Sequence, residues 1–557
     1  MAFEPYRAHR MRGGIIARAM NAPRLRVVAA RCADAGLLLV CVLAACALAL
    51  SLRQDANWDL QNYHFYDPWA WLAGRIFDRD LAAAQLQTFH NPLADVPFYL
   101  LVANGVDPRL VTLWLALPMG IAAWLSCRIA WRLLADLTLP QRAGATIAAL
   151  AIGFGGAMGI AQAGTTTGEW LVTALIMAAL LLALQRYHAR AGTPDARALL
   201  LAGVIAGIAS GLKLTAATYA LGLFVALCAE REPLNARIRG AVLYACGVLA
   251  GLAIALGPWC VQLWRHFGNP LFPYGNEWIR SPWWDARPVL PRIYGPHTVS
   301  DWLWLPFKLL APPTGFVSEQ PYVDARFPLT YLLALIAAGG AAAAWMRRAA
   351  NPLPPQFATT SSQWRFVGVF FTVSFIAWVI VHSILRYTIP LEIASGLLIV
   401  GLIGYLLPPR HATVAIILAV AGLAATTSRT DWGRVEFGPR WFDVRVPPVE
   451  RGALVLLVAS TPMSYVLPFF PPDAQFVGIR SNLVDPAQRN RLANSIAARV
   501  RDHRGPLYAL SFPAGDGERD LRAHALERIP GGCADVRSNM PTSPIELCRL
   551  RRIGAMH

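Results

Sequence analysis

The sequence contains little charge and almost no lysine. Asp, Glu, Lys and Arg make up 15% of the 557 residues, whereas apolar residues make up 56%. A soluble protein of this length cannot usually bury so much apolar surface, so we predict a polytopic membrane protein. Of the 50 basic residues only Lys213 and Lys308 are lysines. This bias toward arginine, together with the abundant alanine, is typical of a GC-rich bacterial genome.

Several familiar motifs are also missing. The sequence has no phosphate-binding Walker loop, no dinucleotide-binding glycine fingerprint and no GxSxG nucleophile elbow. These absences argue against an enzyme that takes nucleotide sugars through a cytosolic Rossmann domain. There is no CxxC or Cys/His cluster that would indicate structural zinc. The net charge of +17 is explained by arginines that flank apolar segments, so we predict no nucleic-acid partner.

The apolar segments number about eleven or twelve, and some are shorter than the roughly 20 residues that a full span requires. Segment 92–103 either crosses the membrane or only dips into its surface. Segments 198–212 and 214–228 form either one long helix or two short helices that meet at 211–213. The segments run near 34–52, 92–103, 110–134, 143–160, 169–185, 198–212, 214–228, 239–264, 329–346, 366–382, 391–407 and 411–427.

Charge asymmetry predicts the orientation. Seven arginines and a single glutamate precede Asp34, which places the N-terminus in the cytoplasm. Residues 34–52 also resemble a signal-peptide core, but more membrane segments follow, so we favour an uncleaved first helix. Loops 53–91 and 265–328 and the region 428–557 are then extracytoplasmic. The expected location is a bacterial inner membrane, with the C-terminal region in the periplasm.

Three regions are predicted. They are a basic cytoplasmic tail (1–33), an all-α membrane domain (34–427) and a small α/β domain (428–557). In the last, 453–460 and 506–511 are predicted strands, and 487–501 and 518–528 are predicted helices. Seven cysteines lie in or beside apolar segments and are expected to be inert. Cys533 and Cys548 lie in the polar C-terminal region, where an extracytoplasmic disulfide is expected.

The polar loop 53–91 resembles the first external loop of GT-C glycosyltransferases, which are polytopic enzymes that use polyprenyl-phosphate sugars. The resemblance rests on DLQNYHFY from Asp59, AWLAGRIFDRD from Ala70 and HNPLADVPFYLL from His90. It covers about the first 230 residues by order of features. Protein mannosyltransferases and aminoarabinose transferases are examples of this type. Their loop carries an acidic pair, but Leu60 stands here in place of the second acid.

The resemblance implies a catalytic role for Asp59. When an acceptor hydroxyl attacks the anomeric carbon and phosphate leaves, one well-placed carboxylate can accept the proton. Phosphate is already a good leaving group, so a paired acid is unnecessary. Asp55, Asp78 and Asp80 are expected to be solvated loop residues. Glu169 starts a segment where such enzymes carry a second acid, although an acid at a helix start is also ordinary capping. With Asp59 it could hold a divalent cation such as Mg²⁺ or Mn²⁺.

Cationic residues provide a candidate phosphate site. Lys213 interrupts an apolar run, and an ionisable side chain at membrane depth is a functional candidate by default. Arg386 can bind phosphate oxygens in a bidentate fork, and Tyr387 can brace a headgroup. An ordinary flanking arginine explains Arg386 equally well. On the acceptor side the candidates are Asn62, Tyr63, His64 and His90.

These observations predict an inverting membrane glycosyltransferase that moves a hexosyl or pentosyl group from a polyprenyl-phosphate donor. The acceptor hydroxyl belongs to a glycan, a lipid or a protein. The rival prediction is a lipid or glycan flippase, in which Lys213 and Arg386 would line a translocation path. Transporters often consist of two related halves, and no such internal symmetry is evident here.

Overall fold

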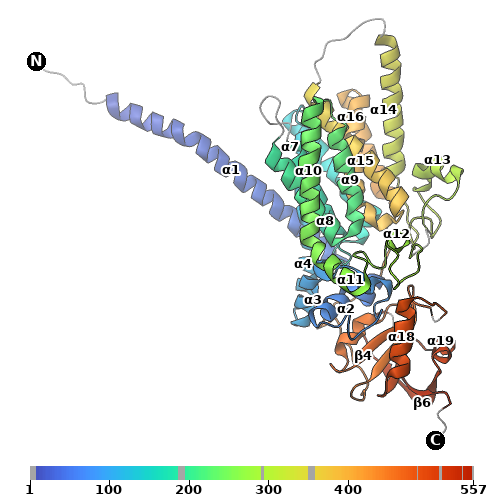
Figure 1. The fold of residues 1–557 in the computed structure, drawn as a ribbon. Helices are drawn as coiled ribbons and strands as arrows, with labels where there is room; N and C mark the ends of the chain where they lie inside the picture. Colours follow the sequence, from blue (N-terminus) through green and yellow to red (C-terminus); the bar gives the residue numbers. More distant parts are fainter. Residues whose placement is uncertain are drawn as a thin grey trace, which may run out of the picture.

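A computed structural model gives the fold in Figure 1 and describes residues 8–185, 195–289, 294–348, 358–485, 487–513, 517–541 and 544–554. A bundle of long helices carries, at one end, a layer of short helices and loops and then a small sheet domain. The chain begins with α1 and ends in the sheet domain. We call the end of the bundle that carries the sheet domain the domain end. The long helices are α1 (Ala8–Ser51), α4 (Pro108–Leu133), α5 (Leu139–Phe154), α7 (Glu169–Gln185), α8 (Ala196–Leu212), α9 (Ala217–Cys228), α10 (Leu234–Ala255), α14 (Arg326–Arg348), α15 (Ala358–Val381), α16 (Ile389–Leu406) and α17 (Pro409–Thr426).

The bundle is that of an integral membrane protein. Seven helical segments in the described ranges are long and apolar enough to cross a membrane, and three further apolar helices are shorter. The predicted eleven or twelve apolar segments therefore include several that are too short to be counted as full spans. Segment 92–103 contains α3 (Val96–Ala103), whose 8 residues extend only about 12 Å. It is too short to cross the roughly 30 Å of hydrocarbon. Of the two alternatives for segment 92–103, the prediction that it crosses the membrane is therefore wrong.

The segment 198–228 is broken rather than continuous. α8 ends at Leu212, Lys213 adopts an extended backbone, and a 3₁₀ turn (Leu214–Ala216) leads into α9. α8 is held against α10 by glycines spaced four residues apart. A Cβ atom on Gly203 would lie 2.1 Å from the Tyr244 carbonyl oxygen, and one on Gly207 would lie 2.2 Å from that of Val248. Such small-residue contacts let two helices approach closely in a membrane, and here they fix the end of α8 that presents Lys213.

Short elements at the domain end connect the bundle to the sheet. They are η1 (Leu60–His64), α2 (Tyr66–Leu72), η2 (Gln85–Phe89), η3 (Pro92–Ala94), α6 (Ala157–Ala161), α11 (Gly257–Phe267), α12 (Asn276–Ile279), α13 (Val299–Lys308) and η6 (Leu385–Thr388). α13 leaves Trp302, Leu303 and Trp304 exposed, which is typical of a helix at a membrane surface.

The C-terminal domain is a five-stranded mixed sheet in the order β4-β3-β5-β7-β6. Strand β3 pairs in parallel with β4 and with β5. Strand β7 pairs antiparallel with β5 and with β6. The predicted strands correspond to β3 and β5, and the predicted helices overlap α18 and α19. The helix predicted over 518–528 ends at Ala523, and residues 526–528 are the start of strand β6. The elements are β3 (Leu454–Val458), η7 (Ser464–Phe469), β4 (Gln475–Arg480), α18 (Arg491–Asp502), β5 (Leu507–Ser511), α19 (Glu518–Ala523), β6 (Leu526–Val536) and β7 (Ile545–Arg552).

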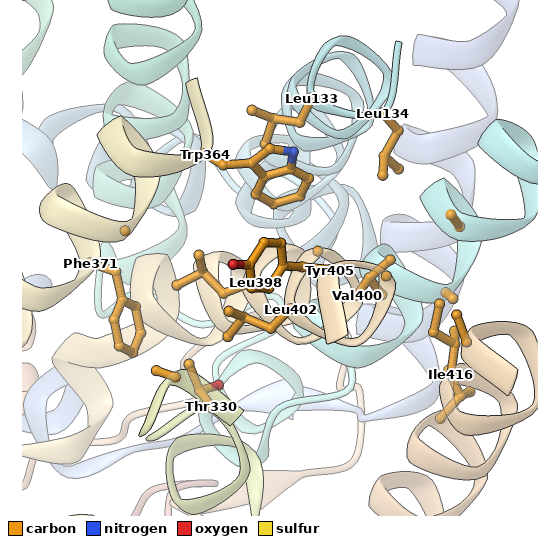
Figure 2. Close-up of a pocket in the computed structure, with 18 of the residues that line it drawn as sticks. Leu133, Leu134, Thr330, Trp364, Phe371, Leu398, Val400, Leu402, Tyr405 and Ile416 are labelled. Carbon is orange, nitrogen blue, oxygen red and sulfur yellow. The ribbon is translucent and has the colours of Figure 1, made fainter. Parts of the chain in front are cut away.

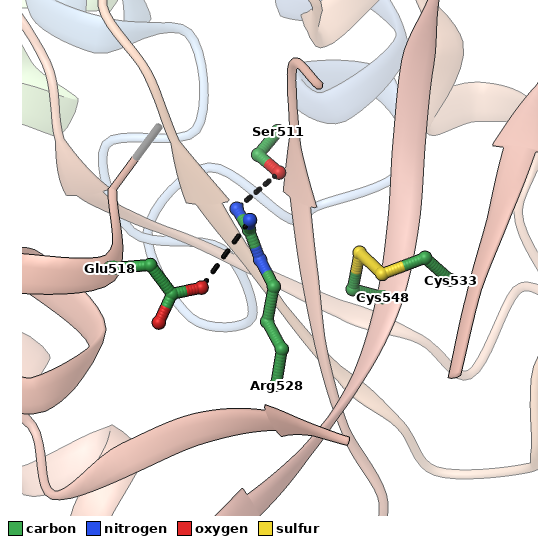
Figure 3. Close-up of a disulfide and its surroundings, with 5 residues drawn as sticks. All are labelled: Ser511, Glu518, Arg528, Cys533 and Cys548. Carbon is green, nitrogen blue, oxygen red and sulfur yellow. Dashed lines mark hydrogen bonds and ion pairs between the residues drawn. A yellow bond between two sulfur atoms is a disulfide. The ribbon is translucent and has the colours of Figure 1, made fainter. Parts of the chain in front are cut away.

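A disulfide joins Cys533 of β6 to Cys548 of β7, which are directly paired across the two strands (Figure 3). Nearby on the sheet, Arg528 contacts Glu518 and the Ser511 hydroxyl. The seven other cysteines are free.

Candidate active site

The loop 53–91 is mostly buried between the bundle and the C-terminal domain. It begins with β1 (Gln54–Asp55), which pairs with β2 (Arg434–Val435) from the segment that follows α17. Asp55 is fully buried and accepts hydrogen bonds from the Thr166 amide and hydroxyl, at 2.8 and 2.9 Å. Asp80 is also fully buried, in an ion pair with Arg75. The prediction of solvated loop aspartates is therefore wrong for both, because each anchors the loop to its surroundings; only Asp78 is exposed.

Asp59 lies at the start of a single π-helical turn, η1. Such turns are rare and frequently occur at functional sites. One Asp59 carboxylate oxygen accepts a hydrogen bond from Arg386 Nη1 at 2.6 Å, across 327 residues of sequence. Burial by itself raises the pKa of Asp59, but the positive charge of Arg386, followed by smaller effects of His64, Lys213 and His90, holds it below its ordinary value. Asp59 is therefore ionised at neutral pH.

Glu169 and Lys213 form a second ion pair beside the first. Lys213 Nζ donates to a Glu169 carboxylate oxygen and, at 2.7 Å, to the Thr167 carbonyl. Glu169 opens α7, and Lys213 lies at the break after α8. The lysine has left the regular helix, so its ammonium group reaches the polar turn that precedes α7.

Tyr387 connects the two ion pairs. The Lys213 ammonium nitrogen lies 5.2 Å from the centre of the Tyr387 ring, and the Arg386 guanidinium carbon lies 5.4 Å from it. Two cations thus meet the same aromatic ring, and each is balanced by one carboxylate. The structure brings Asp59, Glu169, Lys213, Arg386 and Tyr387 together from four separate parts of the chain.

Two buried carboxylates position the segment that carries Glu169. Glu392, on the first turn of α16, accepts hydrogen bonds from the Met158 and Gly159 amides at 3.1 and 2.8 Å. Asp324 accepts one from the Ala157 amide at 3.0 Å. All three amides belong to α6, which leads directly into the turn before Glu169. This role of Glu392 was not predicted from the sequence.

The predicted acceptor-side residues lie around η1 but have different partners. His64 Nδ1 is 2.8 Å from an Asp95 carboxylate oxygen, and His90 Nε2 is 2.9 Å from the Tyr274 hydroxyl. Burial lowers the pKa of His90 to about 4, so its ring is neutral at neutral pH. Asp95 and Tyr274 were missed: Asp95 lies inside the motif HNPLADVPFYLL but was not singled out, and nothing in the sequence brings Tyr274 to this loop.

Tyr63 packs between the rings of His64 and His90, with centroid distances of 4.1 and 5.5 Å. Burial, and then the charge of Asp59, raises the pKa of Tyr63 well above its ordinary value, so it keeps its proton. Asn62 points elsewhere, donating to the Ala84 carbonyl and to the Gln87 side chain at 3.3 and 3.2 Å.

The carboxylates of Asp59 and Glu169 are the groups that would hold a divalent cation. Both carboxylates already contact a cationic side chain, which supplies the positive charge that Mg²⁺ or Mn²⁺ would otherwise provide. Among the described residues, the group that best approaches a metal-ligand cluster is Cys533, Glu546 and Cys548. Its two cysteines are joined in the disulfide. A cation at Asp59 and Glu169 stays a prediction.

A large apolar groove of about 1810 Å³ runs along the bundle between α14 and α17, over α5, α15 and α16 (Figure 2). Leu398, Leu402 and Tyr405 of α16 lie along its floor, and Trp364 and Phe371 of α15 line one side. At the domain end its lining includes Val379. The Val379 carbonyl accepts a hydrogen bond from Ser383, in the turn that leads to Arg386. Among the described residues, none of the five that form the charged site lines the groove.

The structure is an integral membrane bundle with a buried acidic loop after its first helix and a small mixed sheet at one end. The structure is similar to the crystal structure of ArnT from Cupriavidus metallidurans bound to undecaprenyl phosphate. The similarity has a TM-score of 0.51 at 14% sequence identity and covers 92% of this chain and 97% of ArnT. No family model and no curated protein sequence matches the chain. The comparison therefore establishes the fold, including the C-terminal region that the sequence resemblance did not cover.

Proposed function

We propose that this protein is a membrane glycosyltransferase that moves a sugar from a polyprenyl-phosphate donor to an acceptor hydroxyl, on the extracytoplasmic side. The observation that carries the proposal is the convergence of Lys213 and Arg386 on Tyr387, with Asp59 beside them. Two cations on one aromatic ring suit a phosphate headgroup, and a carboxylate next to them suits a general base. The solved structure with the same fold contains undecaprenyl phosphate, which supports this class of donor.

The two ion pairs suggest how the site changes when donor binds. Without donor, Asp59 and Glu169 act as counterions for Arg386 and Lys213. Arg386 Nε is buried without a hydrogen-bond partner in the described part of the chain, so the guanidinium has donor capacity to spare. The donor phosphate would bind this guanidinium and the Lys213 ammonium. Drawing Arg386 toward the phosphate would weaken its hold on Asp59 and make the carboxylate a stronger base.

The reaction is then a single displacement. The acceptor oxygen forms a bond to the anomeric carbon while the bond from that carbon to the phosphate oxygen breaks. The hydroxyl proton passes to Asp59, and the negative charge that develops on the leaving phosphate is balanced by Lys213 and Arg386. One displacement inverts the anomeric configuration. Glu169 acts through Lys213, whose ammonium group it orients. The apolar groove provides room for a polyprenyl chain.

Binding of undecaprenyl phosphate to the purified protein in nanodiscs tests the donor site. Lys213→Gln removes the charge but keeps a polar chain beside Glu169, and it should weaken binding roughly tenfold to a hundredfold, as for loss of a charged hydrogen bond of about 1.5–3 kcal/mol. Lys308→Gln is the matched control. Lys308 pairs with Asp301 on α13, and its substitution should leave the affinity unchanged.

Equal affinity of the two variants would contradict the phosphate site. A second measurement follows the release of polyprenyl phosphate from a polyprenyl-phosphate sugar in the presence of an acceptor hydroxyl. Donor binding that depends on Lys213 without any transfer would favour the flippase instead.

A further inference from the structure

The loop 53–91 joins the C-terminal sheet as part of its edge. The Leu81 amide donates to the Phe476 carbonyl, and the Gly478 amide donates to the Leu81 carbonyl, both at 2.9 Å. Leu81 pairs in parallel with Val477, so it extends the sheet beyond β4 by one residue. Arg75 reinforces this junction by donating to the Pro472 and Ala474 carbonyls at 3.1 and 2.6 Å.

The next residues of the loop occupy a place where parallel sheets usually bind ligands. In such sheets the ligand site lies beyond the carboxyl ends of the strands. Beyond β3, Gln85 donates to the Ser460 carbonyl at 2.9 Å, and Ser464 donates to the Ala83 carbonyl at 2.6 Å. The space left between Ala82, Gln85 and the strand ends is only about 10 Å³, which is too small for a ligand. The domain's own crevice is therefore filled by this loop.

The loop adopts strained backbone conformations where it meets the domain. Ala82 and Gln85 have φ values of 49° and 58°, in the left-handed region that residues other than glycine seldom adopt. Each such residue costs about 1 kcal/mol or more. The cost is offset by the contacts with the C-terminal domain, so the conformation depends on that domain being in place.

Four side-chain amides link this junction to the turn that carries Asp59. Asn482 of the domain and Asn62 of η1 both donate to the Gln87 side-chain oxygen, at 3.3 and 3.2 Å. The Gln85 side chain donates to the Asn62 side-chain oxygen at 3.4 Å, and its own oxygen accepts from the backbone amide of Asn482 at 3.2 Å. Asn62 is three residues from Asp59 and lies inside the same π-helical turn.

We infer that the C-terminal domain is a clamp that holds residues 75–90, and through Gln85, Gln87 and Asn62 the turn bearing Asp59, in the geometry that catalysis requires. The inference rests on the proposed function for its catalytic part. The clamp itself is a physical property of the chain, which can be measured without any substrate. Asn482, Gln85 and Gln87 act in it as positioning residues and do not touch the reacting atoms.

Hydrogen exchange on the full-length protein in nanodiscs tests the clamp. A side chain at Gly478 would lie 2.4 Å from the Ala82 carbonyl oxygen, so Gly478→Val must push the loop away from β4. Asn482→Ala removes two side-chain contacts with the loop, the one to the Gln87 oxygen and the one from the Leu86 backbone amide at 3.0 Å, and it is the milder variant if Gly478→Val fails to fold. Both should raise exchange of the amides in 75–90 and 57–65 at least tenfold. The matched control is Asn494→Ala on α18, whose exposed side chain donates to the Arg489 carbonyl and, in the described part of the chain, makes no hydrogen bond to the loop.

Unchanged protection of 75–90 in Asn482→Ala and Gly478→Val would overturn the clamp, even if the protein proved to have no transferase activity. Where transfer is measurable, kcat of Asn482→Ala should fall roughly tenfold or more, because small displacements of a catalytic group are costly. The KM for donor should change less than about twofold, because Lys213 lies outside the loop. A kcat equal to that of the Asn494→Ala control, despite lost protection, would show that the clamp does not position Asp59 and would also overturn the inference.

Discussion

Two buried Asp–Arg ion pairs have their aspartates in the same loop, and the surroundings of the two pairs are opposite. The pair of Asp80 with Arg75 is saturated. Arg75 binds both carboxylate oxygens at 2.9 and 3.0 Å, and Asp80 also accepts hydrogen bonds from the Tyr66 hydroxyl and the Phe476 amide. Arg75 uses two further donors on two carbonyls of the C-terminal domain, so four of its five N–H donors have protein partners. This pair has little capacity left for a ligand.

The pair of Asp59 with Arg386 is unsaturated. It consists of one short hydrogen bond, a long contact of 3.5 Å from Arg386 to the Tyr387 hydroxyl, and a guanidinium Nε that is buried without a partner in the described chain. A buried polar atom without a partner is costly, and native structures tolerate it mostly where function needs it. The comparison teaches that unused hydrogen-bonding capacity distinguishes the candidate site from the structural ion pair.

A third aspartate in the loop extends the comparison. Asp67 is buried on the first turn of α2, and neither of its carboxylate oxygens has a hydrogen-bond partner in the described ranges. Burial, and then the nearby charge of Asp95, raises its pKa well above the ordinary value. The same substitution, aspartate to asparagine, should therefore have three different effects at positions 59, 80 and 67.

The largest expected effect is on catalysis at Asp59. Asp59→Asn keeps the shape of the side chain but cannot accept a proton at neutral pH. Transfer should fall by roughly 10²–10⁴-fold, the usual contribution of a general base. Donor binding should persist. Transfer assays at matched amounts of folded protein measure this change, and wild-type turnover in Asp59→Asn would leave the flippase as the better hypothesis.

A comparably large effect, on stability rather than on turnover, is expected at Asp80. Asp80→Asn leaves Arg75 buried beside a neutral partner, and breaking a buried pair in this way costs about 3–5 kcal/mol. Folded yield and the midpoint of thermal unfolding should fall, while turnover per folded molecule falls far less than in Asp59→Asn. If Asp80→Asn instead had normal stability and lost its turnover, a fully hydrogen-bonded ion pair would not indicate a structural role. Asp55, buried against Thr166, belongs with Asp80 in this respect.

The smallest effect is expected at Asp67, and it has the opposite sign. Because the pKa of Asp67 is raised in the folded protein, ionisable Asp67 lowers the free energy of unfolding at neutral pH. Asp67→Asn should therefore raise the free energy of unfolding by about 1 kcal/mol or more. The penalty arises only above the ordinary carboxyl pKa of about 4. The gain should therefore be present at pH 7 and vanish as the pH falls toward 4. Thermal unfolding at both pH values measures it, and a loss of stability at pH 7 would indicate an undetected partner for Asp67.

Local patterns were sufficient to predict the class of fold and the charged candidates. Lys213 is conspicuous because it interrupts an apolar run, and an ion at membrane depth needs a partner wherever the chain folds. Asp59 and Glu169 were identified from the resemblance of their segments to GT-C glycosyltransferases, and Arg386 from its place between two apolar segments and its ability to bind phosphate oxygens. The burial of Asp55 and Asp80 could not be predicted, because it depends on Thr166, Arg75 and β4, and two of these three are distant in sequence.

The sequence by itself determined the apolar helices, the polar loop between the first two of them and the strands β3 and β5, whereas the break at Lys213 was one of two alternatives that the structure decided. Each follows from hydropathy or from a local cost that the chain carries wherever it is placed. Only the tertiary structure decided which charges meet. Asp59 and Arg386 are 327 residues apart, and the amides of Asn482 and Asn62 reach Gln87 from two domains. Such contacts cannot be predicted from local sequence patterns. They become favourable only when α16, the loop and the C-terminal sheet pack together and exclude water from the contacting side chains.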